Sequence, residues 1–151
     1  MNPSAPIPPP GPASPAGTGP LAFHQLPVEP DDGLPQAFTC LIGDTPYDFG
    51  VYVNLDGGAD DPPGTLYDLA APARVSTPTA PPGYLVLRVM RPGPQGPQVE
   101  FLRKLVVEPG LVHRSARLAI RLLEARLARG NLNGPGHYGS RIVIGVAQLW
   151  E

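Results

Sequence analysis

Four strand-like segments, rich in apolar residues, form two adjacent pairs along the chain, and in the first pair apolar and polar residues alternate with a period of two. The first pair is residues 37–42 (AFTCLI) and 47–53 (YDFGVYV), and the second is residues 84–91 (YLVLRVMR) and 98–107 (QVEFLRKLVV). A turn rich in Gly, Pro or Asp separates the two members of each pair. Alternation on both sides of such a turn predicts a β-hairpin for the first pair, and two β-like runs around a turn predict a second hairpin.

Two further segments read as strands. Residues 65–70 (TLYDLA) predict a short strand after a loop at 54–64. Residues 141–150 (RIVIGVAQLW) are apolar on both faces and contain no proline, which is typical of a central strand. The connection at 71–83 contains four prolines, and a loop of that length is either functional or mobile.

The segment 111–129 decides the fold class. It is rich in Ala, Leu, Arg and Glu, which favour helix, and Ser115 and Gly130 stand where an N-cap and a C-terminal glycine belong. We therefore predict a helix near 115–129. The chain would then be a small α+β domain, with five or six largely antiparallel strands and this one helix.

The periodicity of the same segment favours a strand instead. Leu118, Ile120 and Leu122 alternate with polar or small residues, and a slip of one residue at Leu122–Leu123 would let the alternation continue to Leu127. One β-bulge supplies such a slip. The alternative is therefore an all-β sandwich or barrel, with this segment as a bulged strand.

Composition divides the chain into an arm and a body. Of the 23 prolines, 11 lie in residues 1–35, and five of them follow one another at a strict spacing of three, which suits a polyproline II edge. We expect residues 1–35 to form a flexible Pro-rich arm and residues 36–151 a β-rich folded domain. An apolar patch in the arm could fold back onto the domain or dock on a partner: Leu21, Phe23, Leu26 and Val28.

Charge is also divided between the two halves. Residues 1–73 contain nine acidic residues and no Lys or Arg, whereas residues 74–151 contain all eleven cations and four acidic residues. The second half could bind an anion, or the two halves could pack as electrostatic complements. Ten of the cations are Arg, whose forked guanidinium suits phosphate and carboxylate. Arg117, Arg121 and Arg126 are the candidate anion-binding residues.

Two four-residue motifs are nearly identical. Residues 54–57 (NLDG) and 131–134 (NLNG) each end in a dipeptide that favours a tight turn. They are either two turns of one type or two loops at one end of the fold that share a polar pocket. In the second case the binding residues would be Asn54, Asp56, Asn131, Asn133 and His137.

Motifs for metal or covalent chemistry are not evident. Cys40 is the single cysteine, and its alternation with apolar neighbours predicts burial rather than nucleophilic duty. The three histidines have no metal-binding spacing, and the GPGHYG run at 134–139 lacks the helix that a phosphate loop needs. We therefore assign no catalytic residue, no metal ligand and no cofactor. Without an apolar run of membrane length or a basic N-terminal leader, we expect a soluble, cytoplasmic protein.

Three functions are compatible with these patterns. The first is a non-catalytic binding or assembly module with a flexible Pro-rich arm, which would bind a protein partner or associate with itself. The second is anion or nucleic-acid binding through the Arg-rich segment 114–129. The third is a small enzyme that uses His137 and an aspartate from a loop. We favour the first, because turn and core signals are clear and catalytic spacing is lacking.

Overall fold

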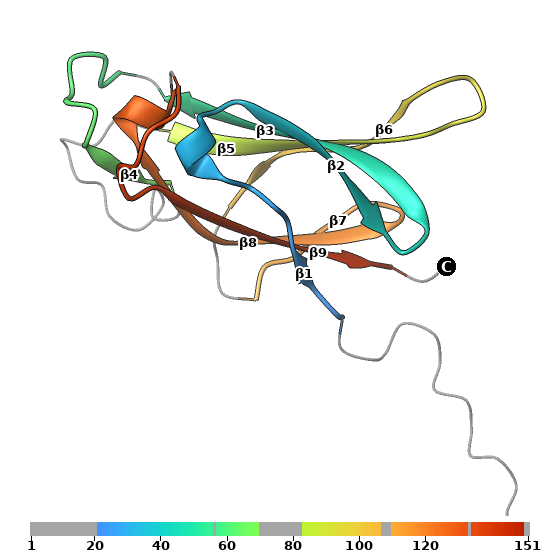
Figure 1. Ribbon diagram of the computed structural model, residues 1–151. Coiled ribbons are helices and arrows are strands. Elements are labelled where there is room, and N and C mark those ends of the chain that lie inside the picture. Colours follow the sequence, from blue (N-terminus) through green and yellow to red (C-terminus); the bar gives the residue numbers. More distant parts are fainter. Residues whose placement is uncertain (1–20, 56, 70–82, 107–109, 133, 150–151) are drawn as a thin grey trace, which may run out of the picture.

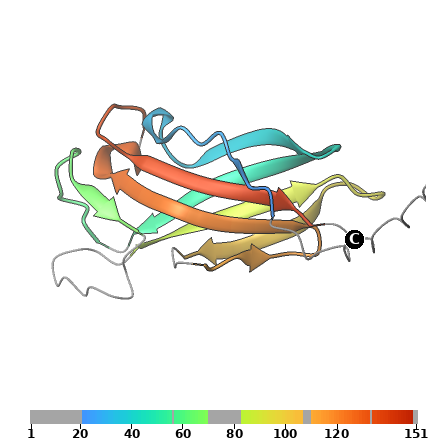
Figure 2. The same cartoon turned by 90° about the horizontal axis from the view of Figure 1, so that it is seen from below.

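The protein consists of two antiparallel β-sheets that lie face to face in this computed structural model (Figure 1, Figure 2). The structure describes residues 21–55, 57–69, 83–106, 110–132 and 134–149. In the described residues no helix is long and apolar enough to cross a membrane. The only helical elements in these ranges are two short 3-10 turns, η1 (Pro30–Asp32) and η2 (Arg129–Leu132).

One sheet has four strands in the order β2–β3–β5–β6, and each neighbouring pair is antiparallel. Both hairpins predicted from the sequence are present in this sheet. The turn between β2 and β3 and the turn between β5 and β6 lie at the same end of the molecule (Figure 1). The bounds of its strands are β2 (Gln36–Ile42), β3 (Thr45–Leu55), β5 (Gly83–Arg91) and β6 (Gln98–Leu105).

The other sheet has five strands, with the order β1–β9–β8–β4 and with β7 also paired to β8. The short strand predicted at 65–70 is β4. The strand predicted to be central, at 141–150, is β9, which lies between β1 and β8. The bounds of its strands are β1 (His24–Gln25), β4 (Leu66–Asp68), β7 (His113–Arg114), β8 (Leu118–Ala128) and β9 (Arg141–Gln148).

The predicted α+β class is wrong, because the segment 115–129 is not a helix. Most of it is the eleven-residue strand β8, which pairs with β9 from Leu118 to Arg126. The fold is all-β, as in the alternative that the alternation of the segment indicated. A helix would have scattered its leucines among arginines around the axis, whereas the strand buries them on one face. Burial of that apolar surface outweighs the helix propensity of Ala, Leu and Arg.

A β-bulge makes this burial possible. Leu122 pairs with Ile144 and Glu124 pairs with Val143, so Leu123 has no partner on β9 and its side chain is 50% exposed. The extra residue shifts the alternation by one position. The inward-facing residues on both sides of the bulge are therefore all buried, namely Leu118, Ile120, Leu122, Ala125 and Leu127.

The core lies between the inner faces of the two sheets. Phe49 of β3 is 1% exposed and stacks on Phe38 of β2, with ring centroids 5.5 Å apart. The N-terminal part of the described chain also enters this core. β1 pairs with β9, and Leu26 and Val28, which follow β1, are buried against both sheets. The apolar patch predicted to fold back therefore does so at these two residues. The period-three prolines of the arm lie outside the described residues.

We predict that deleting Leu123 will leave the fold intact. The deletion removes the unpaired residue and leaves a regular strand in which the same side chains still face inward. The free energy of unfolding should fall by less than about 1.5 kcal/mol, because an exposed side chain is lost and no buried one is turned outward. Urea denaturation of the purified variant measures this change.

Deleting Ala125 is the matched control. That deletion must turn either Glu124 inward or Leu127 outward, and it should cost about 3 kcal/mol or more. Equal losses of stability in the two deletion variants would contradict the assignment of Leu123 as the bulge residue.

Candidate functional site

The loops at one end of the sandwich are held together by Asn131, whose side chain is fully buried. Its Nδ2 donates to the carbonyl of Gly136 at 2.9 Å, and its Oδ1 accepts from the Ser140 hydroxyl at 2.5 Å. The Ser140 hydroxyl in turn accepts from the backbone N–H of Ala128 at 2.7 Å. The amide therefore satisfies both of its ends within the loop that follows β8, which is the arrangement of a structural side chain.

The segment before β2 is fastened to the same loop. The N–H of Leu34 donates to the carbonyl of Asn131, and the N–H of Gly136 donates to the carbonyl of Asp31, each at 2.8 Å. Gly33 has a φ of 92°, and a Cβ there would lie 2.7 Å from the carbonyl carbon of Gly134. The two backbones therefore approach as closely as two glycines allow. These contacts between residues 31–34 and residues 131–136, called the clasp below, fix where β2 begins.

His137 lies on the outside of this clasp. Its Nδ1 is 2.9 Å from the Asp31 Oδ2, and its side chain is 93% exposed. A carboxylate on one ring nitrogen orients the imidazole, as in many catalytic sites, but here the imidazole is almost fully exposed, whereas the Asp31 side chain is 37% exposed. Asp48 and Cys40 lie in the hairpin of β2 and β3, where they pair with Thr39 and Tyr47.

The other residues of the predicted polar pocket are placed differently. Asn54 is exposed near the end of β3 and donates to the Tyr84 hydroxyl at 2.9 Å. Asp56 and Asn133 lie outside the described residues. The two motifs thus belong to the same end of the sandwich, but the described asparagines have separate partners (Figure 1). The shared pocket stays a prediction.

The three candidate arginines do not form one group. Arg117 is at the turn before β8, and Arg126 is nine residues further along, a separation of roughly 30 Å in an extended strand. Between them, the Arg121 guanidinium lies over the Phe23 ring at 4.2 Å, beside a cavity of about 110 Å³ on the outer face of the five-stranded sheet. Arg126 is exposed and pairs through its backbone with Asp68 of β4.

Glu100 is a buried acidic residue that the sequence analysis did not single out. The alternation of β6 assigns it to the outer face, next to Phe101 on the inner face. Val89 pairs with Phe101 but Met90 pairs with Val99, so Glu100 is the unpaired residue of a second bulge. Bulges re-aim side chains, and this one turns Glu100 into the space between the sheets, where its side chain is 5% exposed.

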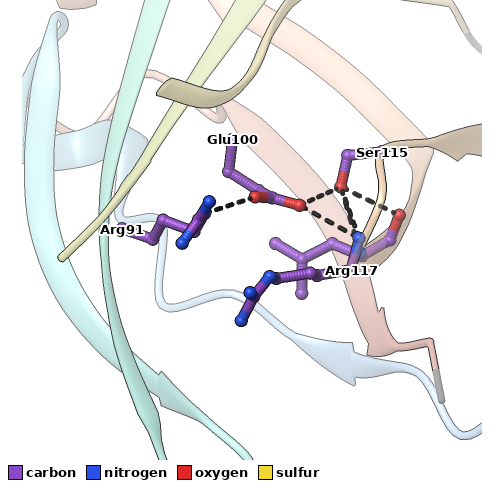
Figure 3. Close-up of polar contacts among 5 residues, drawn as sticks. Arg91, Glu100, Ser115 and Arg117 are labelled. Atoms are coloured by element: carbon purple, nitrogen blue, oxygen red, sulfur yellow. Dashed lines mark hydrogen bonds and ion pairs between the residues drawn. The ribbon is translucent and has the colours of Figure 1, made fainter. Parts of the chain in front are cut away.

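Glu100 connects the two sheets (Figure 3). Its Oε2 forms an ion pair with Arg91 Nε of β5 at 3.0 Å. Its Oε1 accepts from the Ser115 hydroxyl at 2.7 Å and from the backbone N–H of Arg117 at 3.0 Å, both in the turn between β7 and β8. Burial, followed by the nearby charge of Glu100, raises the pKa of the Tyr47 hydroxyl. Both oxygens of the Glu100 carboxylate already bind other groups of the chain, so the role of this side chain is structural.

A second titratable group, His113, lies on β7 and is half-buried. His113 Nε2 accepts a hydrogen bond from the N–H of Val106 at 3.3 Å, and its ring meets the Phe101 ring edge-on at 6.2 Å between centroids. Burial lowers the pKa of His113, and the positive charge of Arg103 adds to this effect.

The edge strand β2 is the least protected edge of the described sheets. It has seven residues, none of them charged and none of them proline, and its pairing with β3 has no bulge. Proteins prevent strand addition with edge strands that are charged, short or bulged, and the other described edges of this protein have these features. β6 has charged residues and a bulge, β4 has three residues, and β1 and β7 have two each.

The side chains of β2 are also incompletely covered. Leu41, on the outer face, is 67% exposed, the highest value among the large exposed hydrophobic side chains of the described residues. On the inner face, Phe38 and Cys40 pack against the core but stay partly exposed, because no further strand shields their flank. A strand added beside β2 would cover all three. The predicted burial of Cys40 is therefore only partial.

A cavity of about 320 Å³ lies near the turns at the other end of the molecule from the clasp. It is lined by Asp48 and Arg91 together with residues of the β5–β6 turn and Pro46. Asp48 Oδ1 already accepts a hydrogen bond from the Thr39 hydroxyl at 2.6 Å. Comparison with known proteins adds no assignment: no family model, no curated protein and no solved structure matches the chain.

We predict that Glu100→Gln will lower the free energy of unfolding by about 2–4 kcal/mol. The amide keeps one acceptor oxygen, so either Arg91 or the turn after β7 loses its partner in a buried site. Chemical denaturation of Glu100→Gln, Ser115→Ala and the double variant would reveal a coupling above about 0.5 kcal/mol. The control is Glu124→Gln, because the Glu124–Arg141 pair is 36% and 69% exposed and should contribute less than about 1 kcal/mol. Similar losses for the two glutamines would contradict the sheet-connecting role.

The lowered pKa of His113 predicts loss of stability in mild acid. The unfolded chain takes up a proton on this residue near its ordinary pKa of 6.5, whereas the folded protein resists protonation. The stabilisation is therefore present above pH 6.5 and is lost as the pH falls from 6.5 through the lower pKa of the folded state. The denaturation midpoint, measured from pH 7.5 to 5, should decrease as the pH falls. His113→Gln should weaken this dependence on pH, and the control variant His24→Gln should leave it in place.

Proposed function

We propose that the protein is a non-catalytic interaction module that binds an extended polypeptide segment along the free edge of β2. The observation that carries this proposal is the contrast between β2 and the other described edges. An edge strand presents unpaired backbone N–H and C=O groups, and a second strand can satisfy them by pairing. Only β2 combines useful length with the absence of charge, proline and bulge among the strands described.

The partly covered side chains support the same proposal. In strand addition, backbone hydrogen bonds give affinity and alternate side chains give specificity. Here the added strand would contact Leu41 on the outer face and Phe38 and Cys40 on the inner face. Burial of apolar surface contributes about 25 cal/mol per Å², so covering these side chains favours binding in addition to the hydrogen bonds.

Hydrogen bonds hold the start of β2 in place, which suits a strand that binds a partner. Gln36, its first residue, accepts a hydrogen bond from the N–H of Glu29 and donates to the carbonyls of Glu29 and Gly33. Gly33 is part of the clasp, so the start of the strand is fixed before a partner arrives. A preorganised edge loses less conformational entropy on binding than a mobile one. We include in the proposal the cytoplasmic location predicted from the sequence, where the free thiol of Cys40 stays reduced.

A peptide titration tests the proposal. The probe is a synthetic peptide with the sequence of residues 36–42, with serine in place of Cys40, added to the isotopically labelled full-length chain. We expect NMR shift changes concentrated at the backbone amides of β2 and β3, and slower hydrogen exchange in β2. Shift changes that spread over other strands, or none at millimolar peptide in a chain that light scattering shows to be monomeric, would show that β2 is not a binding edge.

Two kinds of control sharpen the result. N-methylation of the peptide at alternate positions blocks only one of its edges, so one of the two methylated forms should lose binding and the other should keep it. In the protein, Leu41→Lys should weaken peptide binding, because lysine on an edge opposes strand addition. The matched variant Leu102→Lys, at a 56% exposed residue of β6, should leave binding unchanged.

A further inference from the structure

We propose that the segment bound by β2 is the β2 strand of a second copy of this chain, paired antiparallel about a two-fold axis at Thr39. The two four-stranded sheets would then become one continuous eight-stranded sheet. This inference rests on the proposed function, since it names the occupant of the same edge. It follows from the symmetry of the strand, from its side chains and from the charges around it.

Symmetry restricts the register. Side chains directly opposite each other in an antiparallel pair lie on the same face of the sheet. Inner residues must therefore face inner residues, which requires the two-fold axis to pass through a residue rather than between two. Thr39 is the central residue of the seven in β2, so an axis there pairs every residue of the strand. Such a ladder has roughly six to eight backbone hydrogen bonds, because hydrogen-bonded pairs alternate along it.

The side chains of β2 are complementary to themselves in this register. On the outer face, Leu41 lies opposite Ala37 of the second copy, and the two Thr39 residues lie opposite each other. On the inner face, Phe38 lies opposite Cys40 of the second copy. Each large side chain thus meets a small one, and Thr–Thr and aromatic pairs across strands are favourable. The exposed Leu41 and the partly exposed Phe38 and Cys40 become covered at both ends of the interface.

Charge does not oppose this pairing. β2 has no ionisable group other than the Cys40 thiol, and the charged residue nearest its centre is Asp48, which pairs with Thr39 from β3. In the dimer the two Asp48 residues would be three strand spacings apart, about 14 Å. That separation exceeds the Debye length of about 10 Å at 0.1 M salt, so their repulsion is largely screened. Like-charge repulsion, the usual device against self-pairing, is therefore weak at the centre of this edge.

Disulfide trapping tests the register. In the Thr39→Cys/Cys40→Ser variant the two new thiols lie directly opposite, with Cα atoms about 4.5–5.5 Å apart, within reach of a disulfide. In Leu41→Cys/Cys40→Ser the thiols are displaced by about 14 Å along the strand. In the unaltered chain the Cys40 residues are about 8 Å apart, beyond the limit of about 7 Å. We expect oxidation to cross-link the first variant at least about tenfold faster than the other two proteins.

Light scattering tests the assembly without a cross-link. The unaltered full-length chain should approach twice its mass of 15.9 kDa as its concentration rises. Leu41→Lys should stay monomeric under the same conditions, and Leu102→Lys should dimerise like the unaltered chain. Unlabelled peptide of residues 36–42 should compete with the cross-linking of the Thr39→Cys variant.

The outcomes separate this inference from the proposed function. A chain that stays monomeric at several hundred micromolar, with no cross-link at Thr39→Cys but with peptide bound at β2, overturns the second copy as partner and leaves the edge-binding function standing. A dimer that persists in Leu41→Lys overturns the interface. Faster cross-linking at Cys40 or at Leu41→Cys than at Thr39→Cys overturns the register. Failure of peptide binding in a chain that is also monomeric, by contrast, removes the proposed function itself.

Discussion

The packing of two sheet faces against each other is the interaction on which the rest of this structure depends. Both sheets must present apolar side chains to one shared interior, and in each sheet one strand departs from regular pairing with a bulge. Leu123 is left unpaired so that β8 can bury leucines on both sides of it. Glu100 is left unpaired on β6 and turns inward, where it binds groups from the other sheet. The same device therefore serves the apolar core in one sheet and a polar connection in the other.

Much of the fold could be predicted from the sequence, because hairpins combine local alternation with a turn. Residues 37–53 carry both signals, residues 84–107 form two β-like runs around a turn, and both hairpins are present. The helix predicted near 115–129 was wrong because propensity is a local preference and the burial that outweighs it is set by the other sheet. The alternation of that segment located the bulge at Leu122–Leu123, but a single sequence gave no measure of which signal was stronger.

The candidate site was less predictable for a physical reason. Glu100 has no local signature, since its direction depends on a register shift against β5 that only the paired strands determine. Asn131 was identified as a residue of interest, but its burial among loop carbonyls is a tertiary property. The exposed character of β2 depends on its place at the end of a sheet. The sequence contains the uncharged strand, and only the strand order makes it an edge.

The pairing of β1 with β9 has a mechanical consequence. His24 lies opposite Val146, so the chain before β1 and the chain after β9 leave the sandwich side by side at one end. Tension applied between residues 21 and 149 would therefore load the bonds between β1 and β9 one after another, as in opening a zipper. The two-residue strand would detach at low force and carry Leu26 and Val28 out of the core. The other paired strands of the two sheets would carry no tension until that step was complete.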